Sequence, residues 1–259
     1  MNQDKLSFVI GGVMKAGTCS LDAIFRRHPQ IQMASLKETH FFDDEDRDWS
    51  RPDYDALHAL FPVNDGRLRG EATPITAYWR PAVRRLRDYN PDIKIILLLR
   101  DPVTRAFSHW QQEYSRRREA MLFADAIRGG RDRVRNAPGG QHRFFSYVER
   151  GLYGDQLADL SGNFPKRNIH CEIFEEFFRD RSAGLQHIAQ FLGVAPFPEQ
   201  IPNFHINPAH NVSYPSALTD EDAAYLSDIF RDQAAAVEAF IGKPVSDWTR
   251  RSGSTGAAG

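Results

Sequence analysis

The feature that most constrains the fold is the run Lys94–Leu99 (KIILLL), the most apolar stretch in the chain. A strand that is apolar on both faces needs cover on both, as at the centre of a parallel sheet between helix layers. The run stops at Arg100-Asp101-Pro102, and Pro102 suits the first turn of a helix, which we expect to continue to Arg118. An α/β fold is therefore predicted.

A second junction between a strand and a helix lies near the start of the chain. Leu6–Ile10 is short and apolar, two glycines stop it, and helical spacing resumes over Ser20–Arg27. Glycines at such a place let backbone N–H groups and the helix N-terminus surround a phosphate, although a plain connection is the alternative. We expect Gly11–Ser20 to bind a phosphate-like anion. The side chains that can assist are Lys15, Thr18 and Ser20.

The rest of the chain completes an α/β pattern. Helices are predicted over Gly154–Ser161 and Ala183–Leu192, a strand over Ile169–Ile173, and a helix from a Thr219/Asp222 capping box to Ile241. Loops are predicted over Arg128–Gly140, with mobile character, and over Asn203–Pro215. With 259 residues, 41% of them hydrophobic, we expect a single domain at 1–250, a P-loop-like central parallel β-sheet flanked by helices, and a disordered tail at 251–259.

The charge distribution favours an anionic ligand. The net charge is -1, but Arg80–Arg150 holds sixteen Lys/Arg against eight Asp/Glu. A nucleic-acid partner is not expected, because such proteins are usually basic overall and interleave aromatic residues with their cations. Cys19 and Cys171 fit reduced thiols, and the N-terminus has no apolar stretch long enough for a signal or a membrane span. We expect a cytoplasmic protein, and its oligomeric state is not indicated.

The glycine loop departs from the pattern of nucleoside-triphosphate sites. Gly12-x4-Gly17 matches the first half of that pattern, but Thr18 stands where lysine is required. The apolar strand also ends in Arg100 instead of a Mg²⁺-binding aspartate. A P-loop nucleotide kinase or NTPase is therefore the less favoured alternative. A non-catalytic nucleotide- or glycan-binding protein of the same fold is a second alternative.

Four motifs occur in a characteristic order. They are Lys15–Thr18 (KAGT), Lys37–Asp43 (KETHFFD), Glu71–Pro74 (EATP) and Leu99–Pro102 (LRDP), the last followed by Ser108. With this set the chain resembles the carbohydrate sulfotransferases and is most similar to the heparan sulfate 3-O-sulfotransferase type, from about Phe8 to Trp248. The resemblance implies an enzyme that transfers a sulfuryl group from 3'-phosphoadenosine-5'-phosphosulfate (PAPS) to a hydroxyl or amine, releasing 3',5'-ADP, with no metal required.

The resemblance also implies the donor contacts. The residues matching the 5'-phosphosulfate loop are Lys15, Ala16, Gly17, Thr18, Cys19 and Ser20. Arg100 and Ser108 match the residues that hold the 3'-phosphate. The position of Arg100 agrees, because open α/β sheets bind ligands at the carboxyl ends of their strands and a guanidinium suits a phosphate. Lys15 would stabilise charge on the leaving phosphate oxygen.

On the acceptor side, the resemblance makes Glu38 the general base, with His40 orienting Glu38 or touching the acceptor. The residues matching the acceptor site are Glu38, His40, Asp43, Thr73, Pro74 and Gln112. An extended segment over Lys37–Phe41 would place Glu38 and His40 on one side. We expect a saccharide or a saccharide-containing metabolite as the acceptor.

Two departures from the family pattern concern the substrates. Ala72 stands where the heparan sulfate enzymes have lysine, so arginines between Arg128 and Arg143 would have to supply charge for a polyanion. The family's lysine-glycine-aromatic motif over the 3'-phosphate is also missing. Asn203–Tyr214 is the candidate region for that role. Its candidate side chains are Asn207, His210 and Asn211.

Overall fold

The computed structural model describes residues 5–62, 65–198, 213–245 and 248. Its strands are β1 (Phe8–Gly12), β2 (Ile31–Met33), β3 (Leu68–Ala72), β4 (Lys94–Leu99) and β5 (Ile169–Ile173). They form one sheet in the order β2-β3-β1-β4-β5, in which every neighbouring pair is parallel. The expected fold class, a single domain with a central parallel sheet flanked by helices, is confirmed.

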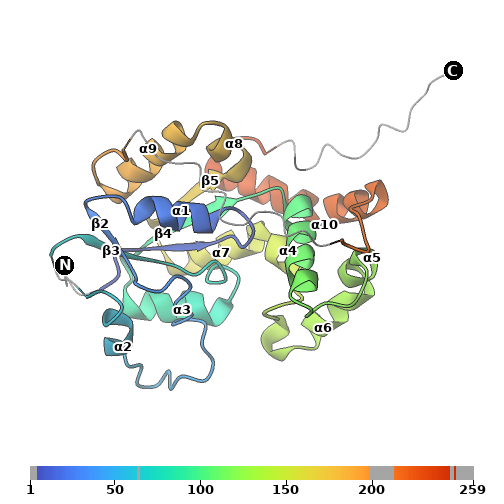
Figure 1. Ribbon diagram of the computed structural model, residues 1–259, viewed down its shortest axis with the longest axis horizontal. Helices are drawn as coiled ribbons and strands as arrows, with labels where there is room; N and C mark the ends of the chain where they lie inside the picture. Colours follow the sequence, from blue (N-terminus) through green and yellow to red (C-terminus); the bar gives the residue numbers. More distant parts are fainter. Residues whose placement is uncertain (1–4, 63–64, 199–212, 246–247, 249–259) are drawn as a thin grey trace. The chain divides into compact units, whose positions relative to one another are not determined.

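The helices follow the expected alternation. They are α1 (Thr18–Phe25), α2 (Asp55–His58), α3 (Arg80–Tyr89), α4 (Pro102–Ser115), α5 (Phe123–Ile127), α6 (Asp132–Arg135), α7 (Tyr153–Asn163), α8 (Phe174–Arg179), α9 (Arg181–Leu192) and α10 (Asp220–Ile241). Because crossovers between parallel strands are right-handed, α1, which leads from β1 outward to β2, lies on the opposite face from α3, which leads from β3 across to β4. Figure 1 shows α1 and α9 on one side of the sheet and α3 on the other.

This arrangement puts the loop after β1 at a switch point of the sheet. Two helices that start from adjacent strands, α1 after β1 and α3 after β3, diverge to opposite faces of the sheet. Open α/β sheets bind their ligands at such switch points, beyond the carboxyl ends of the strands. The fold therefore directs attention to the loop between β1 and α1.

Within this domain, the chain divides into two compact units. The first, residues 1–99 with 158–206, contains the sheet. Its centre is β4, where Ile95–Leu99 are each at most 1% exposed, as the apolar run predicted. Close packing also explains Gly70 in β3, because a Cβ there would lie 2.0 Å from the ring of Phe8.

The second unit, residues 100–157 with 207–259, is helical in its described part. Its core gathers the buried side chains Val103, Trp110, Phe123, Tyr147, Leu226 and Phe230. Helix α10 begins as predicted, since Thr219 Oγ1 accepts a hydrogen bond from the backbone N–H of Asp222 at 3.1 Å. Side chains of α4 and α10 thus contribute to the core of this unit.

The irregular loop predicted over Arg128–Gly140 contains short helical turns. They are Gly129–Arg131, Asp132–Arg135 and Pro138–Gly140. Ion pairs hold this segment: Arg128 to Asp222 at 2.6 Å, Arg131 to Glu149 at 2.8 Å, and Arg133 to Glu119 at 2.8 Å. The sequence prediction of an irregular loop was wrong here because these partners are distant along the chain and leave no local periodicity.

Several predictions fall outside the described residues. They are the tail at 251–259, the domain boundary at 250 and the part of the Asn203–Pro215 loop up to residue 212.

Across the described residues, no helix combines the length and the apolar character needed to cross a membrane. In the same ranges, no group of three or more His, Cys, Asp or Glu side chains is arranged to hold a metal ion. Cys19 and Cys171 are not joined in a disulfide bond.

Candidate active site

The loop between β1 and α1 has the geometry of an anion site. Gly17 occupies the N-cap position of α1 in a left-handed conformation, with φ of 79°, and the first turn of the helix contains no acidic residue. Thr18 and Ser20 are buried at the start of the same helix. The positive end of α1 and its first N–H groups therefore face the loop without a carboxylate to compete for them. This is the location predicted for the 5'-phosphosulfate.

Gly17 is also tightly covered. A Cβ at this position would meet the ring of Phe178 at 2.8 Å and the ring of Phe174 at 3.3 Å. Both rings belong to α8, and their centroids are 4.7 Å apart. Glycine is thus required for the backbone conformation and for the close approach of α8.

Lys37 links the loop helix to the acid segment. Its Nζ lies 2.6 Å from Glu38 Oε1 and also interacts with the thiol of Cys19 on α1. Burial alone would lower the pKa of Lys37, but the contacts with Glu38 and Cys19 outweigh it and raise that pKa. A fixed positive charge therefore stands between the predicted donor loop and the predicted base.

The acid segment is a turn, which corrects the expectation of an extended Lys37–Phe41. Glu38 and His40 have φ values of 58° and 49°, in the left-handed region. The backbone N–H of Glu38 donates to the carbonyl of Ala72 at 3.0 Å, so the chain is tied to the end of β3 before it turns. Tertiary hydrogen bonding, which a local pattern does not reveal, overrides the extended conformation.

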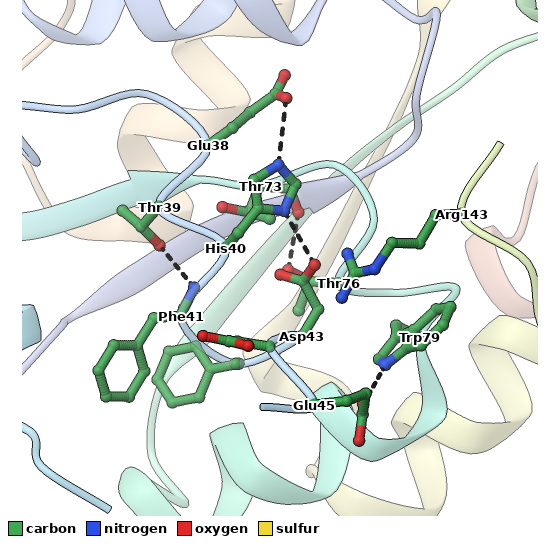
Figure 2. A network of polar contacts seen from close by, with 12 residues as sticks. Glu38, Thr39, His40, Phe41, Asp43, Glu45, Thr73, Thr76, Trp79 and Arg143 are labelled. Carbon is green, nitrogen blue, oxygen red and sulfur yellow. Dashed lines mark hydrogen bonds and ion pairs between the residues drawn. The ribbon is translucent and has the colours of Figure 1, made fainter. Parts of the chain in front are cut away.

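The turn brings three of the six predicted acceptor-side residues together. His40 Nδ1 lies 2.9 Å from Asp43 Oδ2, and His40 Nε2 lies 3.7 Å from Glu38 Oε2. Figure 2 shows the imidazole between the two carboxylates. Asp43 is 1% exposed, whereas about half of the His40 side chain is accessible. The side chains of His40 and Glu38 are therefore partly exposed to solvent, and the buried carboxylate of Asp43 anchors them through His40.

Electrostatics sets the protonation of this group. Contacts with Asp43 and then Glu38 raise the pKa of His40 to about 9. The neighbouring His40 and Lys37 lower the pKa of Glu38 to about 2, against the opposing effect of burial. At neutral pH, Glu38 is accordingly a carboxylate and His40 an imidazolium.

Beneath the turn lies a buried carboxyl that the sequence reasoning missed. Glu71 is 1% exposed, and its Oε2 accepts hydrogen bonds from Thr39 Oγ1 at 3.2 Å and Thr73 Oγ1 at 2.5 Å. Burial raises the pKa of Glu71 to about 7. A glutamate inside a strand that is otherwise buried was the available signal.

The predicted acceptor residues Thr73 and Pro74 lie at the end of β3. The hydroxyl of Thr73 is used inside the protein, and its carbonyl accepts a hydrogen bond from Thr76 at 2.7 Å. The carbonyl of Pro74 approaches Gly12, at 3.9 Å from the position of a Cβ. Both residues are buried where β3 ends, next to Gly12 of β1 and to Glu71 beneath the acid turn.

The other predicted site residues belong to the second unit. Asp101 caps α4 by accepting from the backbone N–H of Val103 at 2.9 Å, and the carbonyl of Arg100 accepts from the hydroxyl of Tyr153 at 2.9 Å. Ser108 is half-buried in α4, and Gln112 donates to Glu113 at 3.2 Å. The contacts predicted for Arg100, Ser108 and Gln112 with substrates stay predictions.

A glycine loop that leads into a helix at a switch point of a parallel sheet is the geometry with which α/β proteins bind phosphate-like anions, and here an ion pair between Lys37 and Glu38 lies beside it. Comparison with known families specifies the class. The family model described as "Sulfotransferase domain" matches residues 6–207, and the chain belongs to this family. The predicted family is thereby confirmed.

Named relatives agree with this assignment. The chain is 30% identical to human heparan sulfate glucosamine 3-O-sulfotransferase 3B1 over 191 residues, which cover 72% of this chain and 45% of that protein. It is 32% identical to mouse heparan sulfate glucosamine 3-O-sulfotransferase 6 over 191 residues, covering 72% and 52%. The chain thus spans about half the length of these relatives. A sulfotransferase from Alicyclobacillus acidocaldarius superimposes with a TM-score of 0.78 at 28% identity, covering 95% of this chain and 99% of that one.

Proposed function

We propose that the protein transfers a sulfuryl group from PAPS to a hydroxyl or amine of an acceptor by in-line displacement, releasing 3',5'-ADP. Membership of the sulfotransferase family and the uncapped N-terminus of α1 support this proposal. The acceptor oxygen attacks sulfur while the bond from sulfur to the phosphate oxygen breaks, so catalysis depends on positioning and charge stabilisation. Lys15 and the backbone N–H groups near Gly17 stabilise the departing phosphate oxygen.

Glu38 is the proposed general base, and the geometry that carries this assignment is the position of His40, 2.9 Å from Asp43 and 3.7 Å from Glu38. With a pKa of about 9, His40 already holds a proton at neutral pH and cannot accept another. Glu38, with a pKa of about 2, is free of protons. His40 therefore orients Glu38, and Glu38 receives the proton of the acceptor.

The low pKa of Glu38 bears on when it acts. A carboxylate held by two cations is a weak base, and general bases work best with a pKa near the working pH. An acceptor hydroxyl that displaces Lys37 from Glu38 removes a contact that lowers this pKa. Acceptor binding would in this way strengthen the base at the moment it is needed.

For the acceptor class we propose a saccharide with few anionic groups. The saccharide follows from the heparan sulfate 3-O-sulfotransferases that the chain resembles. Ala72 offers no charge, and its backbone carbonyl already accepts from Glu38. Of the five arginines from Arg128 to Arg143 that were candidates to replace that charge, Arg128, Arg131, Arg133 and Arg135 are paired with carboxylates of the protein. These pairs support a weakly charged acceptor over a polyanion.

Mass spectrometry of acceptors incubated with PAPS tests the function. Neutral oligosaccharides, sulfated heparan oligosaccharides, phenols, lipids and peptides are compared for an added sulfuryl group. We expect addition to neutral saccharides and release of 3',5'-ADP in equal amount. Absence of transfer to every acceptor class, with the donor intact, would count against the proposal.

Glu38→Gln tests the role of the base. The amide keeps the size of the side chain but cannot accept the proton, so turnover should fall about 10²- to 10⁴-fold. Binding of 3',5'-ADP, measured by calorimetry, should remain close to that of the parent protein. Glu45→Gln is the matched control, because Glu45 contacts Trp79 and Arg85 at the far end of the same segment. Full activity of Glu38→Gln would place the base elsewhere.

A further inference from the structure

The turn that carries Glu38 and His40 needs support from outside itself. Both residues have φ values in the left-handed region, at 58° and 49°, which non-glycine residues avoid unless surrounding contacts impose it. The hydrogen bond from Glu38 N–H to the carbonyl of Ala72 fixes the chain where it enters the turn. A second anchor is required on the far side of Glu38, next to His40.

Thr39 supplies that anchor. Its Oγ1 accepts from the backbone N–H of Phe41 at 3.3 Å, a bond that closes a tight turn around His40. Because an N–H already points at this oxygen, the hydroxyl hydrogen is available for an acceptor on the other side. That acceptor is Glu71 Oε2, at 3.2 Å. The hydroxyl thus connects the backbone of the turn to a side chain of β3.

Glu71 is a firm point of attachment. It is 1% exposed on a strand paired on both sides, by β1 and β2, and its Oε2 also receives the hydroxyl of Thr73 at 2.5 Å. Among the described residues, Glu71 Oε1 has no hydrogen-bonding partner, so the contacts of this buried side chain converge on the oxygen that holds Thr39. A buried carboxyl must keep such donors, since losing them costs more than the bonds contribute.

We infer that Glu71 and Thr39 are positioning residues that hold His40 between Asp43 and Glu38. Figure 2 shows the hydroxyl of Thr39 directed at the backbone N–H of Phe41, whereas the side chain of Glu38 is directed at His40. Neither Glu71 nor Thr39 contacts the reacting atoms in this scheme. The catalytic significance of the pair rests on the proposed function, whereas its effect on the geometry of His40 does not.

The pKa of His40 is the readout, because it reports the contacts with Asp43 and Glu38 directly. We expect Thr39→Val, which keeps the shape but loses both hydrogen bonds, to lower the His40 pKa from about 9 toward its ordinary value of 6.5, measured by NMR titration of the ring. Turnover of the same variant should fall about 10- to 100-fold with the affinity for 3',5'-ADP unchanged, as for a displaced catalytic group.

Matched variants separate this role from a general loss of stability. Thr39→Ser retains the hydroxyl and should restore the His40 pKa and most of the turnover. Thr73→Val removes the other donor to the same Glu71 oxygen without touching the turn, and should leave the His40 pKa in place. Glu71→Leu breaks the anchor from the opposite side and should reproduce the effect of Thr39→Val, which covers the case in which one of the two does not fold.

An unchanged His40 pKa in folded Thr39→Val or Glu71→Leu would overturn the inference, and so would an equal shift in Thr73→Val. If the parent protein transfers no sulfuryl group, the proposed function fails. The NMR titration still decides whether Glu71 and Thr39 position His40, because it needs no substrate.

Discussion

At the scale of single residues, the site depends on a row of alternating charges from Lys37 through Glu38 and His40 to Asp43. Each contact in the row favours the charged form of its neighbour, so the base is ionised and the imidazole protonated over most of the physiological range. This charge pattern supports the roles proposed above, in which Glu38 is the base, as the family resemblance implied, and His40 orients it.

This row predicts a distinct pH profile. Glu38 should stay ionised well below neutral pH, so turnover should be level between about pH 5 and 8 and fall on the alkaline side as His40 loses its proton near pH 9. The sign for stability is the same: the folded pKa of His40 is raised, so its contribution is complete below pH 6.5 and disappears as the pH rises through 9. His40→Gln should lower the plateau and remove the alkaline decline. If the decline stays at the same pH in His40→Gln, another group causes it.

A second prediction at this scale concerns the effect of Glu71 on the stability of the fold. Its pKa is raised from 4.5 to about 7, so the folded state holds this proton more tightly than the unfolded chain and loses stability as the pH rises from 4.5 through 7. Glu71→Gln cannot ionise. The parent loses stability between pH 4 and 8 and the variant does not. The free energy of unfolding of the variant, relative to that of the parent, should therefore rise by on the order of 2–3 kcal/mol over this range.

Urea denaturation at a series of pH values measures this difference. Glu38→Gln serves as the control, because the pKa of Glu38 is lowered to about 2; its difference from the parent should be constant between pH 5 and 7, below the pH at which loss of the Glu38 contact changes the titration of His40. A pH-independent difference for Glu71→Gln would mean that Glu71 keeps an ordinary pKa.

At the scale of elements, the contact between α8 and the loop from β1 to α1 leads to a test at Gly17. Gly17→Ala combines an unfavourable φ of 79° with a clash against the ring of Phe178, and we expect it to destabilise the fold by about 2–4 kcal/mol. Gly193→Ala is the matched control: its φ is 77°, but no described atom lies within 4 Å of the added carbon, so about 1 kcal/mol is expected. Equal losses of stability in the two variants, measured by thermal denaturation, would show that α8 moves away from the added carbon at no cost in free energy.

Elements with a strong local signal were predictable, and those that depend on tertiary partners were not. The run Lys94–Leu99 coincides with β4, and the helix predicted from Pro102 ends three residues early, as α4 at Ser115. Short strands such as β2 and β3 were missed, because β3 (LRGEA) contains an arginine, a glycine and a glutamate that are buried only by the sheet around them. Long apolar runs identify themselves, while a short polar strand is defined by its neighbours.

The same distinction between local and tertiary signals applies to the candidate site. The sequence and the family motifs indicated the residues of the loop and of the acid turn, and the structure brings Glu38, His40 and Asp43 together. It was the conformation of the turn, with two residues in the left-handed region, that could not be foreseen. Its supports, the carbonyl of Ala72 and the carboxyl of Glu71, come from a strand more than thirty residues further along the chain.

At the scale of the whole molecule, ligand-induced stabilisation distinguishes the donor of a sulfotransferase from that of a nucleoside-triphosphate enzyme. A ligand at 100 times its dissociation constant adds about 2.7 kcal/mol, which should raise the Tm of a chain of this size by about 5–10 °C. We expect this shift with 3',5'-ADP and little or none with ATP and Mg²⁺, since Thr18 and Arg100 stand where a triphosphate site requires lysine and a metal-binding aspartate. Lys15→Ala should reduce the shift with 3',5'-ADP. Stabilisation by ATP and Mg²⁺ alone would instead favour a kinase or NTPase, because only such a site derives its affinity from the γ-phosphate and its metal ion.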